Sequence, residues 1–281
     1  MADLPAQTST HSAWVSHLTA PVQWRVVDLI SDLHLHPGDP ATFAAWQDYL
    51  ANTTAHAVFI LGDLFEVWVG DDVLDPSATD AQSEPDDFAR VCADVLRQAG
   101  ARRPQFFMCG NRDFLVGTQM LRQSALQGLS DPCLLEFAGL RWLLSHGDAL
   151  CLQDTDYQQF RKMVRAGQWQ ADFLARPLPE RQHIARELRA QSEQHKRNHP
   201  APSIVDTAMT TRWLGDADAL TLIHGHTHQP ADHALANGRQ RIVLSDWDLQ
   251  ARPARAQVLR LQLNADGEGA TTRRLTPAQA C

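Results

Sequence analysis

Short apolar runs recur along the chain, and in its first half they alternate with segments of helical period. The runs predict strands at about 24–31, 57–61 and 104–109. Between them, apolar side chains spaced three and four residues apart predict helices over 41–54 and 86–99. Strands that alternate with helices are typical of an α/β layer fold.

The pattern changes after residue 146. Over 154–213 the apolar positions keep a helical period and no run is convincing as a strand, which predicts a helical insertion of three helices. Strand patterns return at 219–223, 240–245 and 256–263. We expect a flexible N-terminal extension over 1–22 and one domain over 23–263 that includes a helical lid insertion at 154–213. A flexible C-terminal tail is expected over 264–281.

Five polar clusters each follow directly on an apolar, strand-like run. Ligands of open α/β sheets bind just outside the carboxyl ends of the strands, so we expect the clusters to meet there. A single cluster has an ordinary explanation, because a lone Asp at a strand end is usually a turn residue and a lone His a core residue. Five clusters in one order favour a metal centre. They are Asp32-Leu33-His34, Gly62-Asp63, Gly110-Asn111-Arg112-Asp113, His146-Gly147-Asp148 and His224-Gly225-His226-Thr227-His228.

The clusters supply four imidazoles, two carboxylates and one amide oxygen, a mixture that Mg, Mn, Zn and Fe ions accept. One carboxylate can bridge two cations, and cations ~3.5–4 Å apart act on phosphate esters by clamping the attacking and leaving oxygens. His224 is not counted, since the bend of its segment decides which face it takes. The candidate metal ligands are Asp32, His34, Asp63, Asn111, His146, His226 and His228.

Arg112 follows the candidate ligand Asn111, where a guanidinium can bind phosphate oxygens in a fork and hold developing charge. We expect Arg112, Asp63 and Asn111 to carry catalysis. Asp113 and Asp148 are expected to accept hydrogen bonds from the ligand imidazoles.

Composition narrows the class of function. The net charge of −8 argues against nucleic acid as the main partner. Residues 161–199 carry nine Lys/Arg and four Asp/Glu, so this segment is +5 and the remainder −13. Such a run is often a solvated helical face, but its place between metal clusters favours a basic cap over an anionic substrate. The five scattered cysteines suit a reducing cytosol, and neither a secretory signal nor a transmembrane segment is expected.

The five clusters, in this order, resemble those of the calcineurin-like metallophosphoesterases. The resemblance implies a two-sheet β-sandwich flanked by helices, with two Mn²⁺ ions at the strand ends. It also implies how the ligands divide. One metal would take Asp32, His34, Asp63 and His228, and the other Asp63, Asn111, His146 and His226.

A narrower resemblance rests on Gly110-Asn111-Arg112-Asp113-Phe114, on Leu61 to Asp72 and on the segment from Asp154 to Arg161. These are similar to the UDP-2,3-diacylglucosamine hydrolase family, over about Val27 to Trp247. The family cleaves a pyrophosphate to 2,3-diacylglucosamine 1-phosphate (lipid X) and UMP in lipid A biosynthesis. The resemblance therefore implies a cytoplasmic enzyme bound peripherally to the inner membrane, with monomers favoured. Implied substrate contacts are Asn111, Arg112, Asp154, Tyr157, Arg189 and Ser192.

The chain departs from that family just after Ser192, because Lys196 and His199 replace the expected Asn and Lys. Either Lys196 takes over a phosphate contact or the register of the lid differs. Alternatives also stay open for function: a phosphodiesterase of soluble nucleotides is the second hypothesis. A metal-free binding scaffold is disfavoured because all seven ligands are present. Four apolar lid residues either line an acyl cleft or form the core of the lid: Trp169, Phe173, Leu174 and Leu178.

Overall fold

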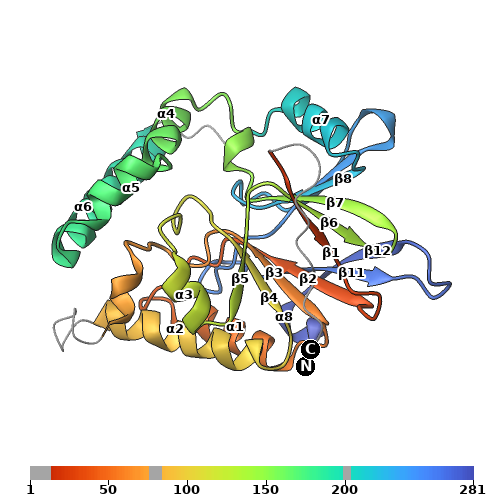
Figure 1. Cartoon of the computed structure of the whole chain (residues 1–281), viewed down its shortest axis with the longest axis horizontal. Coiled ribbons are helices and arrows are strands. Elements are labelled where there is room, and N and C mark those ends of the chain that lie inside the picture. The colour runs from red at the N-terminus through yellow and green to blue at the C-terminus, as the bar shows by residue number, and fades with distance from the viewer. Residues whose placement is uncertain (1–13, 76–83, 199–203) are drawn as a thin grey trace.

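Two six-stranded sheets stack face to face at the centre of the molecule (Figure 1). The computed structural model describes residues 14–75, 84–198 and 204–281. The first sheet has the order β1 (Ser16–Thr19), β6 (Cys133–Phe137), β7 (Leu140–Ser145), β8 (Thr221–His224), β10 (Gln240–Val243), β9 (Ala231–Ala234). The second has the order β12 (Ala270–Leu275), β11 (Val258–Leu263), β2 (Val26–Ile30), β3 (Ala57–Leu61), β4 (Gln105–Met108), β5 (Leu126–Leu129). The predicted β-sandwich is confirmed.

The central strands are mainly apolar on both faces because both faces are covered. In β2, Val27 and Leu29 face the first sheet, while Ile30 packs against the helices outside. In β3, Phe59 lies inside and Ile60 outside, since successive side chains alternate along a strand. Strands buried on both faces are continuous apolar runs in the sequence, and this made them predictable.

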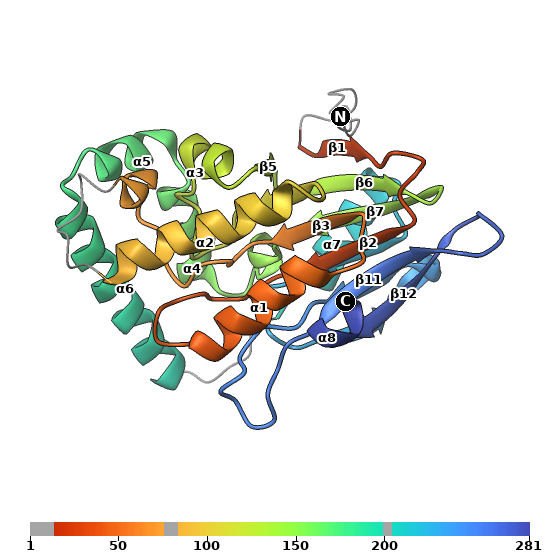
Figure 2. The ribbon, with the colours of Figure 1, turned by 90° about the horizontal axis from the view of Figure 1, so that it is seen from below.

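Helices cover the outer faces of the sandwich (Figure 2). Helices α1 (Pro40–Asn52), α2 (Glu84–Gly100) and α8 (Pro277–Ala280) pack on the second sheet, and α7 (Thr207–Asp216) packs on the first. Helix α3 (Thr118–Gln123) lies beside β5. Asp39 caps the start of helix α1, because its carboxylate accepts the Thr42 N–H, and Pro40 takes the first helical position. None of the described helices is both long and apolar enough to cross a bilayer.

Strand direction decides where the polar clusters meet. Strands β2, β3, β4 and β5 are mutually parallel, and so are β7, β8 and β10. The carboxyl ends of neighbouring parallel strands lie at the same edge of a sheet. The loops that follow β2, β3, β4, β7 and β8 therefore carry the clusters to one edge of the sandwich.

Both chain ends contribute strands, which corrects two predictions. Within the predicted extension 1–22, residues Ser16–Thr19 form β1, which pairs with β6 and buries Leu18. Residues 1–13 lie outside the described residues. The predicted tail 264–281 is also wrong, because β12 pairs with β11 and Thr276 caps α8 through a capping box. These edge elements are half-exposed, so their apolar pattern is weak.

Helices α4 (Thr155–Val164), α5 (Gly167–Leu174) and α6 (Leu178–Asn198) gather at one end of the molecule, away from α7 (Figures 1 and 2). They lie within the span 154–213 for which three helices were predicted. Helix α7 begins within the same span and ends at Asp216, but it buries Thr210 and Leu214 on the side of the first sheet. The predicted boundary at 213 is therefore too late, and the separate helical segment ends with α6.

The apolar residues of this segment divide between core and surface. Phe173 and Leu178 are each 6% exposed and join the core outside the second sheet, and Trp169 stacks on Phe173. Leu174 is 41% exposed. Packing thus favours the lid-core alternative for Phe173 and Leu178, while Leu174 stays available to a ligand.

Arg181 joins the base of α6 to the body of the domain. Its guanidinium is ion-paired with Asp72 and donates to the carbonyl of Val69. The side chain of Arg181 is almost fully buried, so this connection is a fixed part of the fold. The basic segment is therefore anchored over the loop that follows β3.

Candidate metal centre

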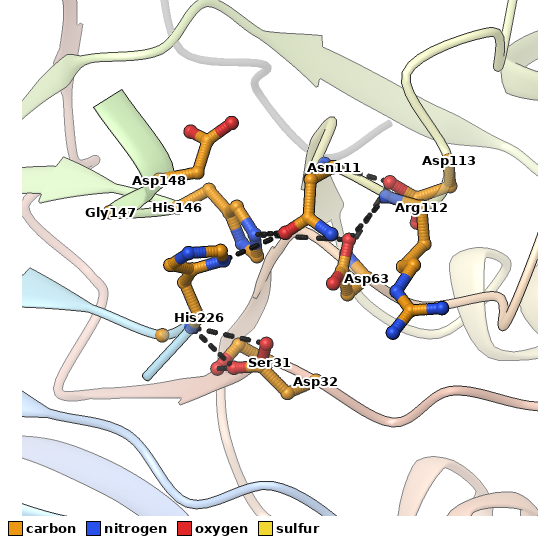
Figure 3. A network of polar contacts seen from close by, with 12 residues as sticks. Ser31, Asp32, Asp63, Asn111, Arg112, Asp113, His146, Gly147, Asp148 and His226 are labelled. Carbon is orange, nitrogen blue, oxygen red and sulfur yellow. Dashed lines mark hydrogen bonds and ion pairs between the residues drawn. The ribbon is translucent and has the colours of Figure 1, made fainter. Parts of the chain in front are cut away.

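Side chains from five strand ends converge at one edge of the sandwich, and Figure 3 shows Asp32, Asp63, Asn111, His146 and His226 grouped there. Asn111, His146 and His226 point toward one another from three different loops (Figure 3). The predicted ligands are Asp32 and His34 after β2, Asp63 after β3, Asn111 after β4, His146 after β7, and His226 and His228 after β8.

Most of these residues have a strained backbone. Five of the seven adopt φ between 48° and 66°, in the left-handed region that disfavours residues other than glycine. Each such residue costs about 1–2 kcal/mol, and strain of this kind concentrates at functional sites. The five are Asp32, His34, Asp63, His226 and His228.

One group of donors comprises Asp32, His34 and His228. Their ligand atoms all lie within 4.8 Å of one another. The Nε2 atoms of His34 and His228 are 3.2 Å apart, and His228 Nε2 lies 3.4 Å from Asp32 Oδ1. Three donor atoms so close together fit a shared cation.

A second group comprises Asp32, Asp63 and His146, again within 4.8 Å. Asn111 adds its amide oxygen, which lies 2.9 Å from His146 Nε2 and 2.7 Å from His226 Nδ1. Asp32 is the residue common to both groups of donors. The family resemblance, by contrast, implied that Asp63 is the shared ligand.

The donor set fits divalent cations. The carboxylates of Asp32 and Asp63 are 0% and 1% exposed, and buried carboxylates are normally paired or bound to metal. A side chain at Gly225 or Gly110 would collide with the Asp32 or Asp63 carboxylate, so the backbone approaches them as closely as only glycine allows. Two carboxylates, four imidazoles and an amide oxygen suit Mn, Fe or Zn ions.

Two of the ligand imidazoles are in the form that binds metal, whereas His146 must release a proton when a cation binds. Burial lowers the pKa of His146, but the carboxylates of Asp63 and Asp32 outweigh it and raise that pKa to about 9. Burial, followed by the proximity of His146, lowers the pKa of His226 to about 3. Burial also lowers the pKa of His34. His226 and His34 are thus neutral at pH 7, the form in which imidazole binds metal.

Asp113 and Asp148 hold the loops in place but do not accept bonds from ligand imidazoles, contrary to prediction. Asp113 accepts the N–H groups of Gly110 and Leu64 at 2.7 and 2.8 Å. Asp148 accepts the Tyr157 hydroxyl at 2.7 Å and Arg161 Nε at 2.8 Å. The Nδ1 of His146 contacts a backbone oxygen instead, at 2.9 Å. Asp113 therefore fixes the main chain of two ligand loops, whereas Asp148 binds side chains of α4.

Glu66 contacts three of the predicted site residues, and the sequence did not single it out. Its carboxylate lies 3.0 Å from His34 Nδ1 and 3.3 Å from Arg112 Nη1, and it also pairs with Arg189. Its only signal in the sequence is one acid inside the apolar run Leu64–Val69. Its partners come from distant segments and are visible only in the fold.

The predicted substrate contacts do not all lie beside the metal centre. Arg112 and Arg189 meet at Glu66, close to the metal centre. The ring of Tyr157 stacks on His226 at 5.9 Å between centroids. Asp154 caps α4 by accepting the Tyr157 N–H, at a distance of 3.1 Å. Ser192 and Lys196 belong to α6, but their side chains are outside the described residues, and so is His199.

His224 has a structural role in this geometry. It is fully buried and its Nδ1 lies 2.8 Å from the carbonyl oxygen of Gly225. Its Nε2 lies 3.4 Å from Arg241, and His224 belongs to neither group of converging donors. Leaving it out of the predicted ligand set is consistent with its position.

Comparison with known proteins agrees with the family resemblance of the five clusters. The family model for the calcineurin-like phosphoesterases matches residues 26–230. The UDP-2,3-diacylglucosamine hydrolase of Chromobacterium violaceum is 46% identical over 232 residues, covering 79% of this chain and 90% of that protein. Its counterpart from Chromohalobacter salexigens is 40% identical, covering 84% and 93%. That from Bordetella pertussis is 41% identical, covering 78% and 84%.

Proposed function

The chain belongs to the calcineurin-like phosphoesterases and, within them, to the UDP-2,3-diacylglucosamine hydrolases, and on this premise we propose its reaction. It hydrolyses the pyrophosphate bond of UDP-2,3-diacylglucosamine and releases 2,3-diacylglucosamine 1-phosphate and UMP, a step of lipid A biosynthesis. The observation that carries the proposal is the convergence of two carboxylates, four imidazoles and an amide beside Arg112.

The seven converging residues would hold two Mn²⁺ ions. Asp32, His34 and His228 form one side of the centre, and Asp63, Asn111, His146 and His226 the other, with Asp32 also among the donors of the second group. When bound, such a cation pair supplies an activated water and stabilises negative charge on phosphate oxygens. Mn²⁺ agrees with a donor set of mixed oxygen and imidazole ligands.

The side chains around the centre position the pyrophosphate. Arg112 is half-buried, and Glu66 and the main-chain bond from Arg112 N–H to Asp63 Oδ1 fix its place. Its guanidinium can bind phosphate oxygens in a fork and neutralise charge that develops as the P–O bond breaks. Arg189 lies at the same carboxylate and adds a second cation for the anionic substrate.

The helical segment α4–α6 would cover the acylated half of the substrate. Met163 and Leu174 are 49% and 41% exposed on α4 and α5, within a segment of net positive charge. Apolar side chains combined with Lys and Arg favour binding at an anionic lipid surface. We therefore include peripheral association with the cytoplasmic face of the inner membrane in the proposal.

Product analysis in ¹⁸O-labelled water tests this function. The protein is incubated with UDP-2,3-diacylglucosamine and Mn²⁺, and the products are identified by mass spectrometry. We expect equal amounts of UMP and 2,3-diacylglucosamine 1-phosphate, with label in UMP if water attacks the uridylyl phosphorus. EDTA and Asp63→Asn should each abolish turnover, whereas Asp87→Asn, an exposed aspartate on α2, should not. Cleavage of a soluble bis-nucleotide without cleavage of the acylated substrate would replace this function with the alternative one.

A further inference from the structure

A polar cavity of about 500 Å³ lies beside the metal centre. His34, His228 and Arg112 line it, so the cavity and the metal centre share a wall. Its volume is in the range of small-molecule sites. A single molecule could therefore occupy this cavity and place a phosphate group at the metal centre.

The loop of residues 246–255 forms another part of the cavity wall. The Trp247 N–H donates to the Asp32 carbonyl at 2.9 Å, which ties the loop to the metal-binding segment. Two nitrogen atoms of Arg255 donate to Asp246 at 2.8 and 3.0 Å. A preformed wall loses little conformational entropy when a ligand binds.

The lining decides which half of the substrate belongs here. Eleven of the fourteen lining residues are polar or charged, and acyl chains packed on them would remove these groups from water without replacing their hydrogen bonds. The exposed apolar residues Met163 and Leu174 lie on α4 and α5 and do not line this cavity. Acyl chains therefore suit the helical segment, and the polar nucleotide suits the cavity.

We propose that this cavity binds the uridine monophosphate half of the substrate, an inference that rests on the proposed function. Gln250 Nε2 donates to the Gly38 carbonyl at 3.0 Å, which orients the amide and leaves its oxygen to accept the N3–H of uracil. Asp248 Oδ1 accepts the Gln250 and Ala251 N–H groups, and Oδ2 accepts Arg255 at 3.1 Å. Each carboxylate oxygen can accept more than one bond, so Oδ2 can also take a ribose hydroxyl.

Calorimetric titration with the two products, one at a time, tests the assignment. UMP should bind Gln250→Ala about fivefold more weakly than wild type, because one hydrogen bond is lost. The affinity for 2,3-diacylglucosamine 1-phosphate should stay within about twofold. The matched control is Gln98→Ala on α2, an exposed glutamine that should change neither affinity. Equal UMP affinity in Gln250→Ala and wild type would overturn the proposal.

Photo-crosslinking locates the nucleotide without turnover. Irradiated 4-thiouridine 5′-monophosphate should attach to a peptide within 246–255 or 33–39, and excess UMP should suppress the adduct. An adduct confined to α4–α6 would overturn the assignment. An adduct at 246–255 in a protein that fails to cleave the acylated substrate would contradict the proposed function and leave the nucleotide site standing.

Discussion

Glu66 Oε2 lies 3.0 Å from Nδ1 of His34, so an acid on the loop after β3 contacts a candidate metal ligand on the loop after β2. The same carboxylate contacts Arg112 and Arg189. Glu66 is 9% exposed, and its three partners are a candidate metal ligand, the arginine that follows Asn111, and a residue of α6. The side chain of Glu66 thus connects the candidate metal centre to helix α6.

Glu66→Gln should weaken metal binding by about 10–100-fold, the usual effect of removing a partner that orients a ligand. The substitution keeps the size of the side chain and removes the negative charge that His34, Arg112 and Arg189 contact. Competition with a chromogenic chelator measures the affinity for Mn²⁺. The exposed Glu268→Gln serves as control. Wild-type metal affinity and turnover in Glu66→Gln would contradict the orienting role.

Arg112→Ala should lower kcat by about 10²–10³, as expected when one preorganised donor to developing charge is lost. Arg112→Lys should recover little of the lost kcat, because an ammonium group cannot bind two phosphate oxygens as a planar guanidinium does. Steady-state kinetics on the acylated substrate measure both. Arg122→Ala, at an exposed position on α3, is the matched control. An unchanged kcat in Arg112→Ala would remove Arg112 from the mechanism.

Tyr157→Phe should reduce the free energy of unfolding by about 1.5–3 kcal/mol, the range for a hydrogen bond to a charged group. The lost bond is the one from the Tyr157 hydroxyl to Asp148. Urea unfolding measures it, and the stacking on His226 remains. Tyr49→Phe is the control: its hydroxyl bonds Asp28 in the core, so it should lower stability without raising KM. A rise in KM for Tyr157→Phe would support the substrate contact that the family resemblance implies, whereas unchanged stability would contradict the Asp148 bond.

Asp131→Asn should change how stability depends on pH. Burial raises the pKa of Asp131, and the negative charge of Asp148 raises it further. The folded protein binds this proton more tightly than the unfolded chain, so Asp131 reduces stability as pH rises from 3.8 toward the raised pKa. Asn keeps an acceptor for the Ser145 hydroxyl and removes the charge.

The stability of Asp131→Asn relative to wild type should therefore grow as pH rises above 3.8 toward the raised pKa of Asp131. Urea unfolding at several pH values measures this difference. Asp87→Asn, on the exposed face of α2, should show a nearly constant difference. A constant difference for Asp131→Asn as well would mean that its pKa is not shifted.

The parts of the fold that the sequence predicts are those whose pattern is set locally. The runs that became β2, β3 and β4 are buried on both faces, and the polar residues directly after them stand at the sheet edge by geometry alone. The grouping of the seven donors could therefore be predicted from the sequence alone. Strands β1 and β12 could not, because they are short or half-exposed and their place depends on pairing with distant partners.

The same distinction applies within the site. Asp32 and His34 follow a strand at fixed spacing, which is a local property. Glu66 acts through residues from three separate segments, and Asp148 turned toward Tyr157 and Arg161 although an imidazole lies two residues before it. Such contacts depend on how loops are oriented after the sheets have paired. Periodicity and spacing carry no information about them.

Anomalous X-ray diffraction from crystals grown with saturating Mn²⁺ tests the central claim most directly. Two peaks should appear ~3.5–4 Å apart. One should lie among Asp32, His34 and His228, and the other among Asp63, Asn111, His146 and His226. The absence of anomalous density among these seven side chains, with Mn²⁺ in excess, would contradict the dimetal centre and the hydrolysis derived from it.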